Sequence, residues 1–196
     1  MDRSELKELH YITPIENLPS ILEHGLLSHR RAARLQHQTV AMPAVQARRA
    51  KVRVPGGRKL HEYVNLYLHA RNPMMYKRRS QHTRLCILSV SHHVLDLPGV
   101  VVTDRNASSD YVRFAPAPNG LAIVRGDLVF AKSWDHPNQI DKWRHASIKC
   151  AEVLVPDRVD TTFVSGAYVS CEATERAVKE VAPDLVTSIN PDLFFR

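Results

Sequence analysis

The sequence predicts an α+β domain in which strands dominate. Short segments of alternating or continuous apolar residues recur along the chain, whereas helical signals are found mostly early and late in it. Elements segregated in this way are typical of an α+β sheet domain. The chain has 196 residues, of which 44% are apolar. We therefore expect a single domain over residues 1–196 with a substantial core.

The first elements are indicated by their boundary signals. Leu9–Thr13 favours a short strand, and residues 13–25 carry the start and stop signals of a helix. Thr13 is placed to cap this helix, Pro14 suits its first position, and Glu16 completes a capping box. Gly25 is expected to end it.

The later elements follow from composition and alternation. Residues 43–51 favour a helix, Pro73 suits the first position of another, and Cys171–Val181 favours a third. Asp104–Asp110 is expected to be a polar loop. Strand patterns cover Tyr63–Leu68, Arg84–Val90, Val100–Thr103, Val112–Phe114, Cys150–Pro156 and Phe163–Ser170.

The charge balance and the cysteines bear on the possible partners and the cellular compartment of the protein. The 27 basic and 20 acidic residues give a net charge of +7, which suits a polyanionic partner or simply a solvated basic surface. The sequence contains no run of 18 apolar residues, and its N-terminus is charged from the second residue, so no membrane association is expected. Cys86, Cys150 and Cys171 are read as reduced core thiols of a cytoplasmic protein.

Common catalytic signatures are absent from the sequence. It contains no glycine-rich dinucleotide motif, no P-loop and no nucleophile elbow. Its cysteines and histidines lack zinc-finger spacing, so no metal is expected.

Glu152 is the most informative residue. It lies in the apolar run Cys150–Pro156, which predicts a buried strand. Burial of an ionised carboxylate is costly unless the group has partners. Such a strand either pairs its carboxylate structurally or uses it for chemistry.

The segment 61–76 supplies a second candidate surface. On a strand, Tyr63, Asn65, Tyr67 and His69 share one face, and the alternate face is apolar. The polar face suits a planar ring held by hydrogen bonds, although an edge strand with an aromatic face gives the same pattern. Met74 and Met75 fit either core packing or ligand contact. Similarly, Arg48 and Arg49 suit phosphate contact or a solvated helix face, and His10 suits a core position.

Six segments together resemble the DarT family, the DNA ADP-ribosyltransferase toxins of bacterial toxin–antitoxin systems. They occur in the family's order and cover most of residues 9–160. The matching segments are Leu9–Leu22, Gln46–Arg49, Pro55–Gly57, His61–Tyr67 with Arg71–Met74, Asp104–Ser108 and Ala151–Pro156.

The resemblance implies an ADP-ribosyltransferase fold, in which a split β-sheet core with flanking helices surrounds a cleft for NAD. It implies that Glu152 is the catalytic glutamate and that Arg49 lies near both NAD and the acceptor. The residues that it places around NAD are His10, Tyr11, Ile12, Thr13, Arg49, Tyr67 and Met74. It also places Asp104–Asp110 in the region that faces the acceptor.

The resemblance further implies NAD as the substrate, a base in single-stranded DNA as the acceptor, and an antitoxin partner with an ADP-ribosyl hydrolase macrodomain. A transferase of the same fold acting on RNA or protein, and an inactive nucleic-acid-binding module, remain alternatives. The basic residues expected to contact the DNA backbone are Arg30–Arg34, Arg78, Arg79, Arg105 and Arg113.

The sequence departs from the family pattern at two places. The opening histidine, His10, is displaced by one position, so Tyr11 is a candidate for its place. Leu66 and Leu68 stand where aromatic residues often flank Tyr67. The acceptor base, thymine or guanine, stays open.

Overall fold

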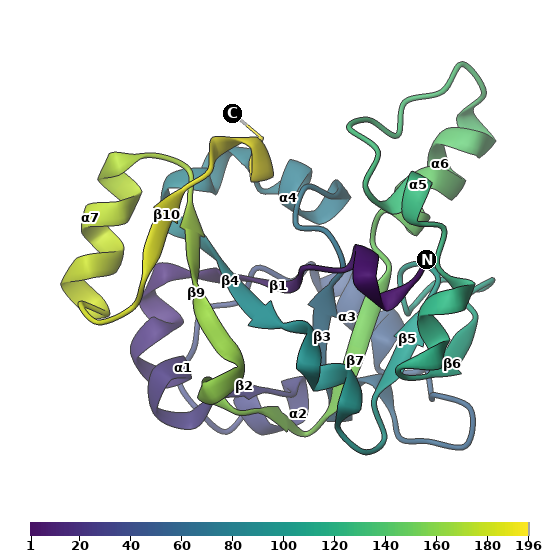
Figure 1. Cartoon of the computed structure of the whole chain (residues 1–196), viewed down its shortest axis with the longest axis horizontal. Helices are drawn as coiled ribbons and strands as arrows, with labels where there is room; N and C mark the ends of the chain where they lie inside the picture. The colour runs from purple at the N-terminus through teal and green to yellow at the C-terminus, as the bar shows by residue number, and fades with distance from the viewer. Residues whose placement is uncertain (196) are drawn as a thin grey trace.

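An eight-stranded sheet forms the centre of the computed structural model, which describes residues 1–195 (Figure 1). The strand order is β10-β9-β4-β1-β3-β7-β5-β6. Every neighbouring pair is antiparallel except β9 and β10. The predicted α+β architecture is confirmed. The strands of this sheet are β1 (Glu8–Pro14), β3 (Tyr63–Tyr67), β4 (Leu85–Ser91), β5 (Val101–Thr103), β6 (Phe114–Pro116), β7 (Glu152–Pro156), β9 (Val164–Val169) and β10 (Thr187–Ile189).

Helices flank the sheet, and a two-stranded ribbon joins β2 (Leu26–Leu27) to β8 (Arg158–Val159). Leu18 and Ile21 of one helix and Val178 of another belong to the large apolar cluster that also contains the inward side chains of β1, β3, β4 and β7. The helices α1 and α7 therefore cover the same face of the sheet. The α-helices are α1 (Leu18–His24), α2 (His29–Ala32), α3 (Pro43–Arg49), α4 (Pro73–Lys77), α5 (Gly126–Val129), α6 (Gln139–Ile148) and α7 (Glu172–Val181).

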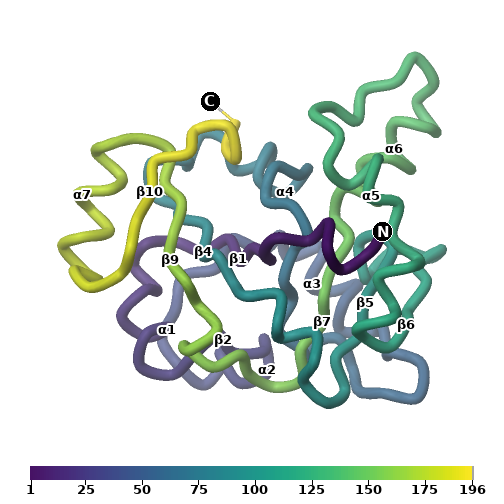
Figure 2. The backbone as a smooth tube through the Cα atoms, in the orientation of Figure 1, coloured from purple at the N-terminus to yellow at the C-terminus, as the bar shows by residue number. Residues whose placement is uncertain are grey.

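The sheet opens between its two central strands. β1 pairs with β4 along its whole length, from Glu8 opposite Ser91 to Pro14 opposite Leu85. Its register with β3 is confined to His10 opposite Tyr67. The backbone tube shows the resulting halves, with β4 and β9 on one side and β7, β5 and β6 on the other (Figure 2). This is the split sheet that the resemblance implies.

The predicted start of the first helix is wrong. Thr13 and Pro14 belong to β1, a short 3₁₀ turn follows, and α1 begins only at Leu18. Pairing of β1 with β4 through Pro14 holds the backbone extended, so sheet formation overrides the local capping signal. The Glu16 carboxylate accepts a hydrogen bond from Arg84 instead. The expected end at Gly25 is confirmed, with φ of 80°.

A second predicted element is displaced. The strand expected over Val112–Phe114 begins only at Phe114, because residue 113 is held by Asp104. The Arg113 N–H donates to the Asp104 carboxylate, and the Arg113 carbonyl accepts from the Asp104 N–H.

Within residues 1–195, no helix combines the length and the apolar composition needed to cross a membrane.

Candidate active site

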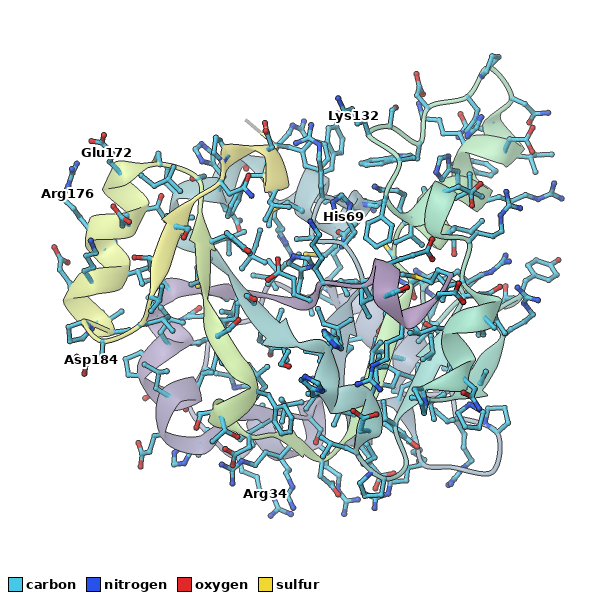
Figure 3. The ribbon with its side chains drawn as sticks, in the orientation of Figure 1. Arg34, His69, Lys132, Glu172, Arg176 and Asp184 are labelled. Carbon is cyan, nitrogen blue, oxygen red and sulfur yellow. The ribbon has the colours of Figure 1, made fainter. Side chains whose placement is uncertain are left out.

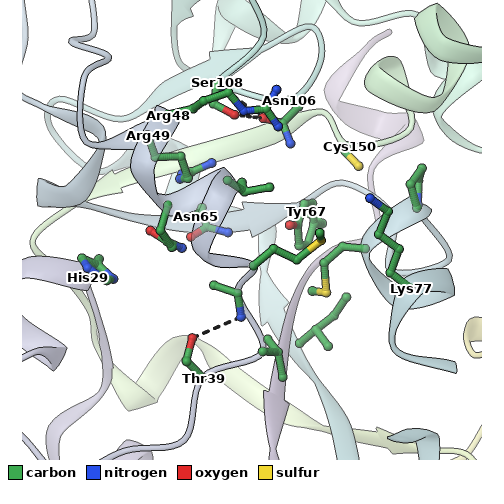
Figure 4. Close-up of a pocket in the computed structure, with 18 of the residues that line it drawn as sticks. His29, Thr39, Arg48, Arg49, Asn65, Tyr67, Lys77, Asn106, Ser108 and Cys150 are labelled. Carbon is green, nitrogen blue, oxygen red and sulfur yellow. Dashed lines mark hydrogen bonds between the residues drawn. The ribbon is translucent and has the colours of Figure 1, made fainter. Parts of the chain in front are cut away.

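A cavity of about 580 Å³ lies where the two halves of the sheet separate. Both central strands contribute to its wall: Ile12 and Thr13 come from β1, and Asn65 and Tyr67 come from β3. The close-up shows Arg49 and Asn65 on one side of Tyr67 and Lys77 on the other (Figure 4). The volume of the cavity lies within the range of small-molecule sites, roughly 300–1,000 Å³.

Glu152 begins β7 and is fully buried. Thr103 of the neighbouring β5 fixes its backbone, because the Thr103 hydroxyl accepts from the Glu152 N–H at 3.0 Å. The Glu152 carboxylate has two partners: Arg49 Nη1 lies 3.0 Å from each of its oxygens, and the Ala107 N–H donates to Oε1 at 3.0 Å. The carboxylate that the sequence singles out is therefore both buried and compensated.

Arg49 connects this carboxylate to the cavity. It is the last residue of α3, which Pro43 starts, and it is 6% exposed. The alternative of a solvated helix face is wrong for this residue. Arg49 lines the cavity, whereas Glu152 is not among the lining residues. The guanidinium thus separates the carboxylate from the cavity in the free chain.

Tyr67 faces the same space. It lies opposite Glu152 in the register of β3 and β7, so both side chains share a face of the sheet. Burial raises the pKa of the Tyr67 phenol well above its ordinary value, and the Glu152 charge raises it further. The phenol therefore stays a hydrogen-bond donor. The edge-strand alternative is wrong, because β3 pairs on both sides.

The first strand contributes to the cavity only through the residues that follow His10. Tyr11, Ile12 and Thr13 line the cavity, but His10 does not. His10 lies beside Tyr67 with its Nε2 3.2 Å from the Glu8 carboxylate. Its Nδ1 is buried without a hydrogen-bond partner within residues 1–195. The cavity thus reaches the residues that follow His10 and not His10 itself.

Met74 and Met75 separate into the two roles that the sequence leaves open. Met74 lines the cavity, and Met75 is fully buried in the core. Cys150 also lines the cavity, and burial raises the pKa of its thiol to about 12. The Cys150 thiol therefore lines the cavity in its neutral form at physiological pH.

The loop between β5 and β6 closes over Glu152. Asp104 is nearly buried and binds both Arg105 and Arg113. Burial tends to raise the pKa of Asp104, but hydrogen bonds from these arginines hold it below its usual value. Arg105 and Arg113, two of the arginines expected to contact DNA, are therefore engaged with Asp104, and Asn106 and Ser108 of the loop line the cavity instead.

The sequence reasoning missed α6 and the residues that it brings to the cavity, Trp143, Ala146 and Ser147. A signal was present: the Asn138 side chain accepts from the Ile140 N–H, and an acid follows in the first turn.

His29 and His61, whose rings lie 4.2 Å apart beside the cavity, were also missed. Burial lowers the pKa of both rings, and the Arg49 charge contributes. Only His29 of this pair lines the cavity wall, and the lowered pKa values leave both rings mostly neutral at pH 7.

Among residues 1–195, no group of three or more His, Cys, Asp or Glu is placed to hold a metal ion.

The chain is similar to known proteins along most of its length. A family model described as "ssDNA thymidine ADP-ribosyltransferase, DarT" matches residues 10–195. A DNA ADP-ribosyl transferase of Thermus aquaticus is 34% identical over 193 residues, covering 90% of this chain and 82% of that protein. A DNA ADP-ribosyl transferase–DNA ADP-ribosyl glycohydrolase fusion protein of Thermosipho africanus is 31% identical, covering 94% of this chain. The chain spans about half the length of that fusion protein, 46%.

Solved structures agree with the sequence comparison. Thermus sp. 2.9 DarT in complex with ADP-ribosylated ssDNA superposes with a TM-score of 0.85 and 25% identity, covering 100% of this chain and 99% of that chain. The same protein has been solved with NAD⁺, with a TM-score of 0.80, 25% identity and coverage of 97% of this chain and 98% of that chain. A match that runs from residue 10 to residue 195 and a shared split sheet lead to one conclusion: the chain belongs to the DarT family.

Proposed function

We propose that this chain transfers ADP-ribose from NAD to a base of single-stranded DNA and releases nicotinamide. The observation that carries the proposal is the buried Arg49–Glu152 pair beside a cavity of about 580 Å³ in a chain of this family. The Thermus sp. 2.9 relative has been solved with both NAD⁺ and ADP-ribosylated ssDNA, which supports both substrates.

Glu152 is the proposed catalytic residue. Breaking the bond between nicotinamide and ribose gives the ribose carbon oxocarbenium character, which a nearby carboxylate stabilises. A nitrogen of the acceptor base then bonds to this carbon, and its proton passes to the carboxylate. Because Arg49 covers the carboxylate in the free chain, its guanidinium must shift before the ribose can contact Glu152.

Arg49 is the second proposed catalytic residue. It is placed either to stabilise a base that becomes anionic as its proton leaves or to bind phosphate. The proposed NAD contacts are Tyr11, Ile12, Thr13, Tyr67 and Met74, all of which line the cavity. His10 remains a predicted contact, with less geometric support because it lies outside the cavity wall.

Thymine is the proposed acceptor base, since the description of the matching family names thymidine. Besides Arg49, two cations line the cavity, Arg48 and Lys77, and they suit the phosphates of NAD or of a DNA strand. The site needs no metal in this proposal.

A hydrolase that removes the modification is the proposed partner. The Thermosipho africanus relative carries a DNA ADP-ribosyl glycohydrolase in the same polypeptide. A separate antitoxin with a hydrolase macrodomain would serve this chain in the same way.

The proposed location of the chain and its antitoxin is the cytoplasm, where NAD and replicating DNA meet. Residues 1–196 are proposed to form one domain, because one sheet joins β10 to β6.

Incubation with labelled NAD and thymine-containing single-stranded DNA tests the function. We expect label on this DNA, none on DNA without thymine, and a loss of roughly 10²–10⁴-fold in rate for Glu152→Gln. Glu172→Gln is the matched control, because Glu172 lies on α7 away from the cavity (Figure 3). Undiminished transfer by a folded Glu152→Gln protein would sink the assignment. Label on RNA or protein would favour another acceptor, and DNA binding without label would favour an inactive binding module.

A further inference from the structure

Three aromatic side chains from distant parts of the sequence meet above α4. Tyr76 belongs to α4, Trp134 to the segment between α5 and α6, and Phe195 to the C-terminal tail. Their rings contact edge to face, with centroid distances of 5.2 Å for Tyr76–Phe195, 5.7 Å for Trp134–Phe195 and 5.9 Å for Tyr76–Trp134. We call these three residues the aromatic cluster.

Two arginines lie on the faces of these rings. The guanidinium carbon of Arg71 is 4.0 Å from the centroid of Phe195, and that of Arg79 is 4.5 Å from the centroid of Tyr76. Arg71 is held there by hydrogen bonds to the carbonyls of Asp192 and Phe194, and Arg79 by one to the carbonyl of Tyr76. Arginine planes on aromatic faces are a common stacking arrangement.

The cluster is open to solvent and basic, unlike a core. Tyr76 is 43% exposed and Arg79 is exposed, while Trp134 and Phe195 are partly buried. Lys77 and Lys132 add positive charge nearby, and neither forms an ion pair within residues 1–195. Figure 3 shows Lys132 at the top of the molecule, on the segment that carries Trp134. The cation-bearing aromatic surface therefore faces outward.

The cluster adjoins the proposed active site through one short helix. Pro73, Met74 and Lys77 of α4 line the cavity, and Tyr76 precedes Lys77 on the same helix. Neighbouring residues of one helical turn lie within about 5 Å of each other along the axis. The aromatic cluster thus adjoins the helix that supplies part of the cavity wall.

We propose that the aromatic cluster with Arg79 is a stacking platform for a nucleotide that flanks the modified base in single-stranded DNA. The inference rests on the proposed function and adds a binding subsite to it. Single-stranded nucleic acid is held by cationic surfaces that combine backbone contact with base stacking on aromatic or arginine planes. Every base presents a π-face, so this subsite contributes affinity with little sequence preference.

The test compares a short substrate with a long one. Steady-state transfer is measured on a thymine-containing oligonucleotide of about 4 nucleotides and on one of about 16, the span of site sizes for single-strand binding folds. Tyr76→Ala and Arg79→Ala should each raise KM for the long oligonucleotide by roughly five- to a hundredfold and leave kcat and the short substrate nearly unchanged. Tyr76→Phe keeps the ring and should behave as the unmodified chain does. Arg176→Ala, on α7, is the control for loss of an exposed arginine (Figure 3).

Two outcomes would overturn the platform. One is an equal KM for Tyr76→Ala and the unmodified chain on the long substrate. The other is an equal loss of transfer rate by Tyr76→Ala on the short and the long substrate, together with a lower Tm. That result would assign the cluster to packing of the C-terminal tail. Failure of the proposed function looks different, because the unmodified chain would then label neither oligonucleotide.

Discussion

Arg49 and Glu152 depend on each other for their burial. The side chains of the pair are 7% and 0% exposed, and within residues 1–195 the Glu152 carboxylate has only the Ala107 N–H as a further partner. Removing one member of a buried ion pair leaves an uncompensated charge in a medium that solvates it poorly. The pair is therefore a structural unit as well as the proposed catalytic one.

Replacing Arg49 with methionine should lower the free energy of unfolding by about 3 kcal/mol, because the Glu152 carboxylate is left buried without its cation. Adding Glu152→Gln removes that charge, so the double variant should be more stable than Arg49→Met alone. Urea unfolding of the two single variants and the double variant measures the coupling. If the loss in free energy of unfolding of the double variant equals the sum of the losses of the two single variants, the two residues do not depend on each other.

The sequence predicted the members of this site better than their contacts. A lone acid in an apolar strand indicated Glu152, and the alternation of β3 placed Asn65 and Tyr67 on one face. The contact between Arg49 and Glu152 joins residues 103 positions apart, so no local pattern contains it. The position of His10 outside the cavity likewise depends on where the two halves of the sheet separate.

At the scale of elements, the loop between β5 and β6 positions the Ala107 N–H on Glu152. Asp104 joins the two ends of this loop, because it binds Arg105 next to it and both the backbone and the side chain of Arg113. Asn106 adds a backbone hydrogen bond to Ser147 of α6. The loop is therefore anchored at its ends and at α6, with the Glu152 contact between these anchors.

Asp104→Asn should slow transfer by about fivefold, because a neutral amide holds the two guanidinium groups less strongly and a weakened hydrogen bond contributes about 1 kcal/mol. The expected change is in kcat, measured with saturating NAD and DNA, with the sheet still folded by circular dichroism. Asp127→Asn is a matched control, since Asp127 binds Arg125 in the same two-pronged way but on an exposed surface. Equal rates for the Asp104→Asn protein and the unmodified chain would remove the loop from the mechanism.

The start of the first helix was predicted wrongly for a physical reason, whereas the main strands and the helix starts at Pro43 and Pro73 were predicted correctly. The alternation and apolar runs of β3, β4, β7 and β9 reflect burial that the final sheet preserves. The capping signal at Thr13 is local, and the pairing of β1 with β4 is stronger than it. The helix α6 has little apolar periodicity, so only its N-cap indicates it.

For the whole molecule, no local sequence pattern predicted the strand order, and the split was expected only from the family resemblance, since both arise from pairings between distant segments. The distribution of charge belongs to this scale too. Many arginines are neutralised by acids, such as Arg3 by Asp96 and Arg84 by Glu16. Within residues 1–195, cations without an ion pair include Arg48 and Lys77 at the cavity and Arg71, Arg79 and Lys132 at the aromatic cluster. These five cations lie along the surface where the proposed function places the DNA strand.

This distribution predicts that binding of single-stranded DNA weakens steeply with salt. Each phosphate neutralised by a protein cation lowers the logarithm of the binding constant by about 0.7 per unit of log salt concentration. Lys77→Gln should therefore reduce the slope by about 0.7, because it removes one unpaired cation at the cavity rim. Fluorescence anisotropy of a labelled oligonucleotide at several salt concentrations gives both slopes, and Arg176→Ala should keep the slope of the unmodified chain because Arg176 lies on the distant α7. An affinity independent of salt would mean that these cations serve solubility and that the strand is held by contacts with its bases alone.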